Sequence, residues 1–303
     1  MNFESDIAEI NCGFVALVGR PNVGKSTLLN RLIGQKISIV SQRPQTTRHR
    51  ILGIHHRDDA QIIYVDTPGL HSKTPKAMNR YLNRAAATVL EDVDVVAFVV
   101  EGIRWTPDDE FVLEKLKRLD TPVILVINKI DKVRDKSLLL PHIASLSEKY
   151  AFADVIPVSA AKGTQLDALE EAFKSLLPMS PPLFPDEQVT DRSERFMAAE
   201  LVREQLMRTL GQEVPYATTV EIEAFEREGR LLKVAALIWV ERSGQKTIVI
   251  GRQGQVLKRV GKSAREAMEG LFDCRVYLQL WVKVREGWSD DERALQSLGY
   301  FEE

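Results

Sequence analysis

Residues 14–26 read Phe-Val-Ala-Leu-Val-Gly-Arg-Pro-Asn-Val-Gly-Lys-Ser, an apolar run that ends in a glycine-rich loop. Such a run is typical of a buried strand, and residues 25–32 have the spacing of an amphipathic helix. Residues 19–26 match the phosphate-binding pattern G-x-x-x-x-G-K-S in the strand–loop–helix context that the pattern requires. Backbone N–H groups of such a loop turn inward onto phosphates. The stretch therefore predicts a nucleoside triphosphate site.

Further apolar runs follow along the first half of the chain, at residues 62–65, 95–100, 123–127 and 155–158. Strands that are apolar on both faces and alternate with amphipathic stretches indicate βαβ units. We therefore expect an α/β fold with a mostly parallel sheet and helices on both faces. Residues 49–56 are less apolar and predict an edge strand beside residues 62–65. Polar motifs follow several of these runs, at the edge where open α/β sheets bind ligands.

The motif Asn128-Lys129-Ile130-Asp131 predicts which base the site accepts. The Asp131 carboxylate would accept hydrogen bonds from N1 and N2 of guanine, a pair of donors that adenine lacks. A buried acceptor left unpaired is costly, so this residue can discriminate strongly. Lys129 would pack along the base plane, and backbone N–H groups of residues 159–162 would approach the guanine O6. We expect GTP or GDP to contact Gly19, Asn22, Val23, Gly24, Lys25, Ser26, Thr27, Asp66, Thr67, Pro68, Gly69, Asn128, Lys129, Asp131, Ser159, Ala160 and Ala161.

A magnesium ion is expected beside the phosphates. Ser26 would bind it directly, and Asp66, which begins the motif Asp-Thr-Pro-Gly, would bind it through water. A threonine that completes the metal shell is needed between the phosphate loop and Asp66. Thr46 and Thr47 both lie in this interval, and we choose Thr47. The N–H of Gly69 would contact the γ-phosphate, so the loop would be released when this phosphate leaves.

The residue after Gly69 bears on catalysis. Ras-like GTPases place there a glutamine that orients the attacking water, whereas this chain has the apolar Leu70. We therefore expect slow hydrolysis or another positioning group. Asn22 is a candidate, since an asparagine at this place helps to bind K⁺ in related GTPases; a plain turn residue is an equal alternative. The expected catalytic residues are Asn22, Lys25, Thr47 and Gly69.

Composition and charge are those of an ordinary globular protein. The chain has 303 residues, which suggests two domains of about 150 residues each. Its formal net charge of −2 gives no whole-chain signal for nucleic acid. The only cysteines, Cys12 and Cys274, argue for free thiols in a reducing compartment. The acidic first residues do not resemble a signal peptide, and the apolar run at 93–100 is too short to span a bilayer. We expect a cytoplasmic protein.

Prolines mark a boundary after an expected helix at residues 165–177. The stretch Pro-Met-Ser-Pro-Pro-Leu-Phe-Pro at 178–185 can neither continue a helix nor join a sheet ladder, so we interpret residues 178–191 as a linker. It would separate a GTPase domain, residues 1–177, from a second domain, residues 192–303. The second domain has the expected order helix–strand–strand–helix–helix–strand and a short final helix.

The second domain carries one motif, Ile-Gly-Arg-Gln-Gly at residues 250–254, which fits the I-G-x-x-G loop of a KH module. Its glycines would let the backbone approach a sugar–phosphate strand, beside an apolar face that holds bases. Residues 242–265 contain seven basic residues and no acid, and the acids of the domain are expected elsewhere, at Glu221, Glu223, Glu226, Glu228 and in the tail. This segregated charge favours RNA binding over a merely solvated basic helix. The expected RNA contacts are Ile250, Gly251, Arg252, Gln253, Gly254, Lys258, Arg259 and Lys262.

Together the motifs resemble the Era family of bacterial ribosome-assembly GTPases over nearly the whole chain. Gly-Arg-Pro-Asn-Val-Gly-Lys-Ser, Pro-Gln-Thr-Thr-Arg, Asp-Thr-Pro-Gly-Leu, Asn-Lys-Ile-Asp and Val-Ile-Gly-Arg-Gln-Gly stand in the family's order. The resemblance implies a P-loop GTPase domain followed by a type II KH domain, and binding to the 3′ end of 16S ribosomal RNA in the 30S subunit. It also implies a cytoplasmic monomer with some peripheral association at the inner membrane, and a switch in which GTP favours RNA binding. Arg252-Gln253 departs from the commoner lysine-containing pair, which bears on the strength of its phosphate contact.

Two other interpretations stay open from the sequence. The second domain of a GTPase switch can instead bind a protein or a membrane surface, and a second domain that fails to bind RNA would favour this. The chain can also be a scaffold that holds GTP without hydrolysing it, which an absence of phosphate release with K⁺ and RNA supplied would favour. We prefer the GTP-hydrolysing, RNA-binding switch.

Overall fold

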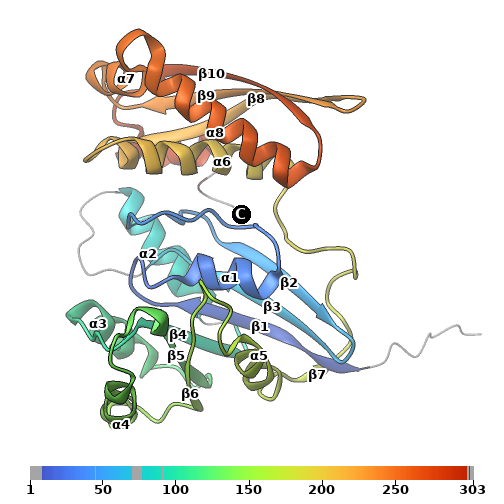
Figure 1. The fold of residues 1–303 in the computed structure, drawn as a ribbon, viewed down its shortest axis with the longest axis vertical. Coiled ribbons are helices and arrows are strands. Elements are labelled where there is room, and N and C mark those ends of the chain that lie inside the picture. Colours follow the sequence, from blue (N-terminus) through green and yellow to red (C-terminus); the bar gives the residue numbers. More distant parts are fainter. Residues whose placement is uncertain (1–8, 45, 70–76, 91, 299, 301–303) are drawn as a thin grey trace, which may run out of the picture. The chain divides into compact units, whose positions relative to one another are not determined.

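The computed structural model describes residues 9–44, 46–69, 77–90, 92–298 and 300. The chain divides into two compact units, drawn in Figure 1. The first unit takes its residues from the ranges 1–38, 49–73 and 82–191, and the second from 39–48, 74–81 and 192–303. No helix in the described part of the chain combines the length and apolar character that crossing a bilayer requires. The domain boundaries expected from the sequence stay a prediction. The compact units differ from them in the two short segments and in grouping residues 178–191 with the first unit.

The first unit is built on a sheet whose main strand order is β2-β3-β1-β4-β5-β6. Its parallel strands are β1 (Ile10–Val18), β3 (Ala60–Asp66), β4 (Val95–Glu101), β5 (Val123–Asn128) and β6 (Asp154–Pro157). The edge strand β2 (Ile51–Arg57) runs antiparallel to β3, in the place that its less apolar sequence predicts. The mostly parallel sheet expected from the apolar runs is confirmed.

Helices cover both faces of this sheet. On one face, residues of α2 (Ala77–Val89), α3 (Pro107–Leu116) and α4 (Leu139–Ser147) join a core with side chains of β1 and β4, including Ala86, Val112, Leu146, Ala16 and Phe98. On the other face lie α1 (Lys25–Ile33) and α5 (Leu166–Lys174). There Phe173 meets Tyr64 of β3 edge to face, with ring centroids 5.9 Å apart. The motifs therefore stand at the carboxyl ends of strands held between two helical layers.

Residues 178–191 pack against the first unit, which corrects one expectation. Met179 and Ser180 form the strand β7, antiparallel to β1. The buried carboxamide of Gln61 accepts a hydrogen bond from the N–H of Phe184 at 3.0 Å and donates one to its carbonyl at 2.8 Å. The prediction that the proline cluster cannot join a ladder is therefore wrong for two residues. Met179 and Ser180 stand between prolines and keep the N–H groups that a ladder needs.

The second unit contains a three-stranded sheet with the order β10-β9-β8. Its elements are α6 (Glu194–Thr209), β8 (Thr218–Glu228), β9 (Leu231–Val240), α7 (Ser243–Ile250), α8 (Gln255–Phe272), β10 (Arg275–Val284) and α9 (Glu292–Ser297). Strands β8 and β9 pair antiparallel, and β10 runs parallel to β9. Figure 1 shows α6 and α8 beside each other along this sheet, and Leu201, Ile238 and Val260 belong to the core that they share with it. The predicted order of helices and strands is confirmed.

The segment 39–48 is anchored to α6 and to the start of β8 by charged hydrogen bonds. The guanidinium of Arg48, which is 2% exposed, donates to the carbonyl of Thr218 at 2.8 Å. Arg203 of α6 donates to the carbonyl of Thr46. Buried charged donors are stable only when acceptors surround them. These contacts explain why the segment belongs to the second unit although residues of the first unit flank it in sequence.

Candidate nucleotide and nucleic-acid sites

Asn128 connects the loops that surround the candidate nucleotide site. It is the last residue of β5 and is 1% exposed. Its side-chain nitrogen donates to the carbonyl of Val23 in the phosphate loop at 2.9 Å, and its oxygen accepts from the N–H of Ala160 at 3.0 Å. One buried amide thus holds residues 19–26 and 159–162 on its two sides. This arrangement brings together three motifs that lie far apart in sequence.

Two glycines of the phosphate loop occupy places where a side chain would not fit. At Gly19, with a φ of +153°, a Cβ would approach the carbonyl oxygen of Val99 to 2.3 Å. At Gly24, with a φ of +106°, a Cβ would lie 2.4 Å from the Asn128 Nδ2. Asn22 has a φ of 66°, a left-handed conformation that asparagine tolerates better than most residues. The shape of the loop therefore depends on the glycines of the motif.

Lys25 is the first residue of α1, and its side chain reaches back over the loop. Its Nζ donates to the carbonyls of Gly19 at 2.9 Å and Arg20 at 3.2 Å. Burial lowers the pKa of Lys25 from 10.5 to about 8; the charge of Asp66 opposes this shift, and that of Arg20 adds to it. A phosphate group in the loop would supply negative charge beside the buried ammonium and favour its protonated form. The lysine is therefore placed to bind phosphate.

Oxygen ligands suited to magnesium converge at the end of β3. The Ser26 hydroxyl donates to Oδ2 of the buried Asp66 at 2.7 Å, and the Ser38 hydroxyl donates to the same oxygen at 2.9 Å. Hydroxyl and carboxylate oxygens are ligands that Mg²⁺ prefers, so this donor set fits the ion. Sequence reasoning missed Ser38, because it belongs to no motif and nothing in its local sequence distinguishes it.

The rest of the Asp-Thr-Pro-Gly motif passes close to the phosphate loop. The hydroxyl of Thr67 donates to the carbonyl of Leu17 at 2.9 Å. A Cβ at Gly69, the residue after Pro68, would lie 2.9 Å from the backbone nitrogen of Pro21 in the phosphate loop. A residue with a side chain at this place would have to move the loop or itself. The glycine therefore allows the two motifs to approach each other.

The structure does not test the predicted roles of two residues near the phosphates, Thr47 and Leu70. Thr47 is buried in the segment 39–48 of the second unit, whereas Ser26 and Asp66 belong to the first unit. Its role as a metal ligand stays a prediction. Leu70, the apolar residue expected to slow hydrolysis, lies outside the described residues.

On the base side, the residues expected to contact guanine are also bonded to one another. The Ser159 hydroxyl donates to a carboxylate oxygen of Asp131 at 2.5 Å. The Nζ of Lys129 donates to the carbonyl of Asn22 at 2.5 Å and pairs with Glu101 at 3.0 Å. Burial opposes ionisation of Glu101, but the neighbouring cations outweigh it and lower the pKa of this carboxyl. Sequence reasoning missed Glu101, although a carboxylate at the end of an apolar strand is a usable signal.

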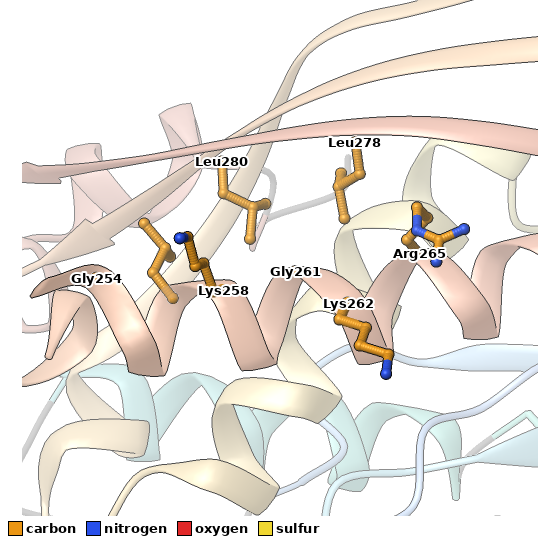
Figure 2. Close-up of a pocket in the computed structure, with 8 residues that line it drawn as sticks. Gly254, Lys258, Gly261, Lys262, Arg265, Leu278 and Leu280 are labelled. Atoms are coloured by element: carbon orange, nitrogen blue, oxygen red, sulfur yellow. The ribbon is translucent and has the colours of Figure 1, made fainter.

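A groove of about 460 Å³ lies between α8 and β10 in the second unit. Figure 2 shows Leu278 and Leu280 pointing from β10 toward the helix, so they form an apolar floor. The lining combines such apolar side chains with cations of α8 and consists of Gly254, Leu257, Lys258, Gly261, Lys262, Arg265, Leu278 and Leu280. Apolar surface for bases beside positive charge for phosphates is the combination that single-stranded nucleic acid requires.

The predicted RNA contacts fall partly inside this groove. Gly254, Lys258 and Lys262 line it, whereas the lining does not include Ile250, Gly251, Arg252, Gln253 or Arg259. Sequence reasoning missed Leu257, Gly261 and the two leucines of β10. Leu257 and Gly261 follow Gly254 at helical spacing, so one face of the predicted helix would have revealed them.

The expectation that acids lie away from the basic run is wrong for two residues of α8. Glu269 pairs with Arg265 at 2.7 Å, and Glu266 lies 3.9 Å from Lys262. Both acids follow the acid-free stretch directly, and side chains four residues apart on a helix are neighbours. They reduce the positive charge at the Arg265 end of the groove.

Comparisons with known proteins agree with both sites. Residues 14–129 match a family described as 50S ribosome-binding GTPase, and residues 213–289 match the KH domain family. GTPase Era from Marinobacter nauticus is 58% identical over 291 residues, which cover 96% of this chain and 95% of that protein. GTPase Era from Pseudomonas aeruginosa is 57% identical over 289 residues, which cover 95% of each.

Two solved structures are similar to this chain over nearly its whole length. An Era variant from Aquifex aeolicus bound to GDP and AlF4⁻ is 39% identical, with a TM-score of 0.92 over 96% of this chain and 99% of that one. An Era structure in complex with MgGDPNP and nucleotides 1506–1542 of 16S ribosomal RNA is 40% identical, with a TM-score of 0.92 and the same coverage. High identity over nearly the full length, together with the two family matches, leads to one conclusion: the chain belongs to the Era family of GTPases.

Proposed function

We propose that this GTPase is a molecular switch that binds the 3′ end of 16S ribosomal RNA and acts in the maturation of the small ribosomal subunit. The observation that carries the proposal is that one chain holds both a guanine-nucleotide site and a groove with an apolar floor and cations. The Era structure that was solved with MgGDPNP and a 16S ribosomal RNA fragment supports it, since it covers 96% of this chain.

For nucleotide binding, we assign the phosphates to residues 19–27 and the base to Asn128, Lys129, Asp131 and residues 159–161. Lys25 would exchange its present carbonyl partners for the β- and γ-phosphate oxygens. Its buried ammonium is stabilised by that exchange, because a phosphate carries more negative charge than a carbonyl. Asp131 would turn its carboxylate to the N1 and N2 donors of guanine.

Hydrolysis proceeds by attack of a water molecule on the γ-phosphate, with charge spread over the γ-oxygens in the transition state. Lys25 and the N–H of Gly69 would lie beside that charge and stabilise it. When held by Ser26, Asp66 and Thr47, Mg²⁺ supplies further positive charge to the phosphates. We assign Asn22 to K⁺, which would add charge near the same oxygens. The intrinsic rate is expected to be slow, because Leu70 cannot orient the water.

The segment that contains Thr47 gives the switch a physical route to the RNA-binding unit. Arg48 and Arg203 attach this segment to α6 and to the start of β8. Binding of Thr47 to Mg²⁺ in the GTP state would pull on the segment and strain the hydrogen bonds of Arg48 and Arg203. Release of the γ-phosphate would remove this strain. A ligand moves an equilibrium only through different contacts in two states, and this segment would provide such a difference.

The remaining assignments concern the setting of the protein. We propose a GTPase domain at residues 1–177, a linker at 178–191 and a KH domain at 192–303. The RNA contacts would come from the loop 250–254 and from Lys258, Arg259 and Lys262. We also propose a cytoplasmic monomer that associates peripherally with the inner membrane. These assignments rest on the family resemblance and on the motifs.

Binding of full-length protein to a labelled single strand with the 16S 3′-end sequence tests the function. A scrambled strand of equal composition is the control, and both are titrated with Mg²⁺ and either GDPNP or GDP. We expect preference for the 16S sequence, tighter binding with GDPNP, and loss of binding in the double variant Gly251→Asp/Gly254→Asp while GTP hydrolysis continues.

Binding that ignores both the sequence and the glycines would overturn the RNA assignment. It would leave a basic patch for a protein or membrane surface, the second candidate. Flotation of the same variants with vesicles that contain anionic lipid would then separate the membrane from a protein partner.

A further inference from the structure

We propose that Arg31 is a positioning residue that aims the backbone N–H of Ala161 at the guanine O6. The proposal rests on the proposed function, because it assumes that a guanine base lies beside the loop 159–162. Arg31 belongs to none of the nucleotide motifs. It stands in the last turn of α1, at the opposite end of that helix from Lys25.

The guanidinium of Arg31 bonds to two consecutive carbonyls of the base loop. Its Nε donates to the carbonyl of Ala160 at 3.2 Å, and its Nη2 donates to the carbonyl of Ala161 at 3.1 Å. A planar guanidinium presents its donors in a rigid fork, so two bonds to one loop determine the direction of both peptide groups. The loop is thus tied to α1 as well as to Asn128.

The direction of the Ala160 carbonyl determines that of the next N–H. In a trans peptide the C=O and the N–H of one plane point in opposite directions, and the described residues contain no cis peptide bond. Because the Ala160 carbonyl faces Arg31, the Ala161 N–H in the same plane faces away from it. This turns the donor away from α1.

The neighbouring N–H groups of this loop are already engaged. The N–H of Ala160 donates to Asn128 at 3.0 Å, and the N–H of Lys162 donates to the carbonyl of Ser159 at 3.2 Å. Among the residues that the structure describes, the Ala161 N–H has no acceptor. It is therefore the donor that this loop can give to a ligand.

The expected position of guanine agrees with this direction. Asp131, the acceptor for N1 and N2, is bonded to Ser159, two residues before Ala161. In guanine the O6 lies next to N1 on the same edge of the ring. An edge that meets Asp131 at N1 and N2 therefore needs a donor nearby for O6, and Arg31 orients the one that is available.

The test compares affinities for GDP and for 6-thioguanosine diphosphate, in which sulfur, a weaker acceptor, replaces O6. The proteins are the full chain and its variants Arg31→Ala, Arg31→Lys and Arg118→Ala. Arg118 is also exposed but follows α3 and precedes β5, at the sheet edge opposite the motifs, so its loss is a matched control for charge. Thermal unfolding without nucleotide checks that each variant folds.

We expect Arg31→Ala to weaken GDP binding by roughly three- to tenfold, the effect of one or two net hydrogen bonds. Binding of the thio analogue should change less, so the ratio of the two affinities falls. Arg31→Lys should restore part of the GDP affinity, because one ammonium can hold one of the carbonyls, and Arg118→Ala should match the wild type. Equal losses for both nucleotides, no loss, or no rescue by lysine would overturn the proposal.

The same titrations distinguish a failure of the Arg31 proposal from a failure of the guanine site on which it rests. If the wild-type protein does not prefer GDP over ADP, the guanine site itself is wrong. If that preference stands but the ratio of GDP to thio-analogue affinity is unchanged in Arg31→Ala, only the role of Arg31 is wrong.

Discussion

In the nucleotide site the polar groups are buried and bonded to one another, whereas in the groove of the second unit the cations lie at the surface beside apolar side chains. Asn128 and Ser159 are almost inaccessible and join separate loops by hydrogen bonds of 2.5 to 3.0 Å. The cations Lys258 and Lys262 are exposed, and the floor beside them is leucine.

The two sites select their ligands by different physical means. Buried donors and acceptors at set positions reject a base that cannot pair with them, because the unpaired group then pays the full cost of desolvation. Exposed cations attract a phosphate backbone of any sequence at long range, so they add affinity without adding to the expected preference for the 16S sequence. We therefore expect the first site to lose affinity abruptly when one group changes, and the second to lose it gradually.

The largest effect should come from Asp131→Asn. The amide cannot accept both guanine donors, so GDP affinity should fall by about a hundredfold or more. Xanthosine diphosphate should bind better than to the wild type, because its 2-oxo group can accept from the new amide. Competition with a fluorescent guanine nucleotide measures both. The exposed Asp120→Asn is the control, and a loss below threefold at Asp131 would contradict the view of a fixed base site.

Two glycines of the KH loop should differ in their tolerance of a methyl group. Gly251 has φ 73° and ψ 173°, a region that only glycine populates readily, and a Cβ there would lie 2.4 Å from Val256 Cγ2. Gly254 also has a positive φ, but a Cβ there would meet no atom within 4 Å.

Gly251→Ala should lower the free energy of unfolding by about 2 to 3 kcal/mol, and Gly254→Ala by only about 1 kcal/mol. Denaturant unfolding of the two full-length variants measures the difference, and each variant is the control for the other. Equal destabilisation would show that the close approach to Val256 carries no cost. Equal destabilisation would also indicate that the KH loop tolerates a side chain more readily than the nucleotide loops do.

The pH dependence of GDP binding should report the buried charge of Lys25. Burial lowers the pKa of this lysine to about 8, and a bound phosphate would raise it again. Above pH 8 the free protein loses the proton that the complex keeps, so binding takes up a proton and affinity falls as pH rises. The slope approaches about tenfold per pH unit.

Calorimetry in buffers of different ionisation enthalpy measures this proton uptake, between about pH 7, where the terminal phosphate of GDP is already mostly ionised, and a pH below the ionisation of guanine N1. Uptake should be near zero at the acid end and should grow through pH 8. A flat affinity for GDP across the range would mean that Lys25 stays charged in the free protein.

The smallest effect should come from Lys262→Ala in the groove. This exposed cation should contribute one screened phosphate contact, so affinity for the 16S strand should fall a few-fold and the slope of log K against log salt should decrease by about 0.7 to 1. The control is Lys283→Ala, a lysine of β10 that pairs with Glu223 and does not line the groove. A loss confined to one RNA sequence would contradict the gradual, charge-based binding expected here.

Much of the first unit could be predicted from short apolar runs. Residues 14–18, 62–65, 95–100 and 123–127 are parts of β1, β3, β4 and β5, because strands covered on both faces must be apolar throughout. The packing of residues 178–191 could not be predicted. Proline excluded regular structure in general, but whether two intervening N–H groups find a partner depends on Ile10 and Asn11 of β1, which precede the stretch that pairs with β4.

The candidate sites show the same division. The motif residues 19–26 and 128–131 could be named from sequence, since a turn or a strand end needs particular residues at neighbouring positions. Only part of the groove could be predicted from the sequence. The residues of α8 follow a regular helical spacing, whereas Leu278 and Leu280 come from the strand β10, which is separate in the sequence. Ser38, a supporting residue, carries no local pattern, because many residue types at many places can supply one hydrogen bond.

From the order of its residues alone, this chain reveals a guanine-nucleotide site above a parallel sheet and a KH loop after it, because each depends on neighbouring residues whose backbone conformation and chemistry are tightly constrained. The grouping of residues 39–48 with the second unit, and the hydrogen bonds of Ser38 to Asp66 and of Arg31 to the loop 159–162, became visible only in the folded chain. These contacts link residues from 28 to 170 positions apart in the chain. Such contacts form only when whole elements have packed against one another, so no pattern of neighbouring residues predicts them.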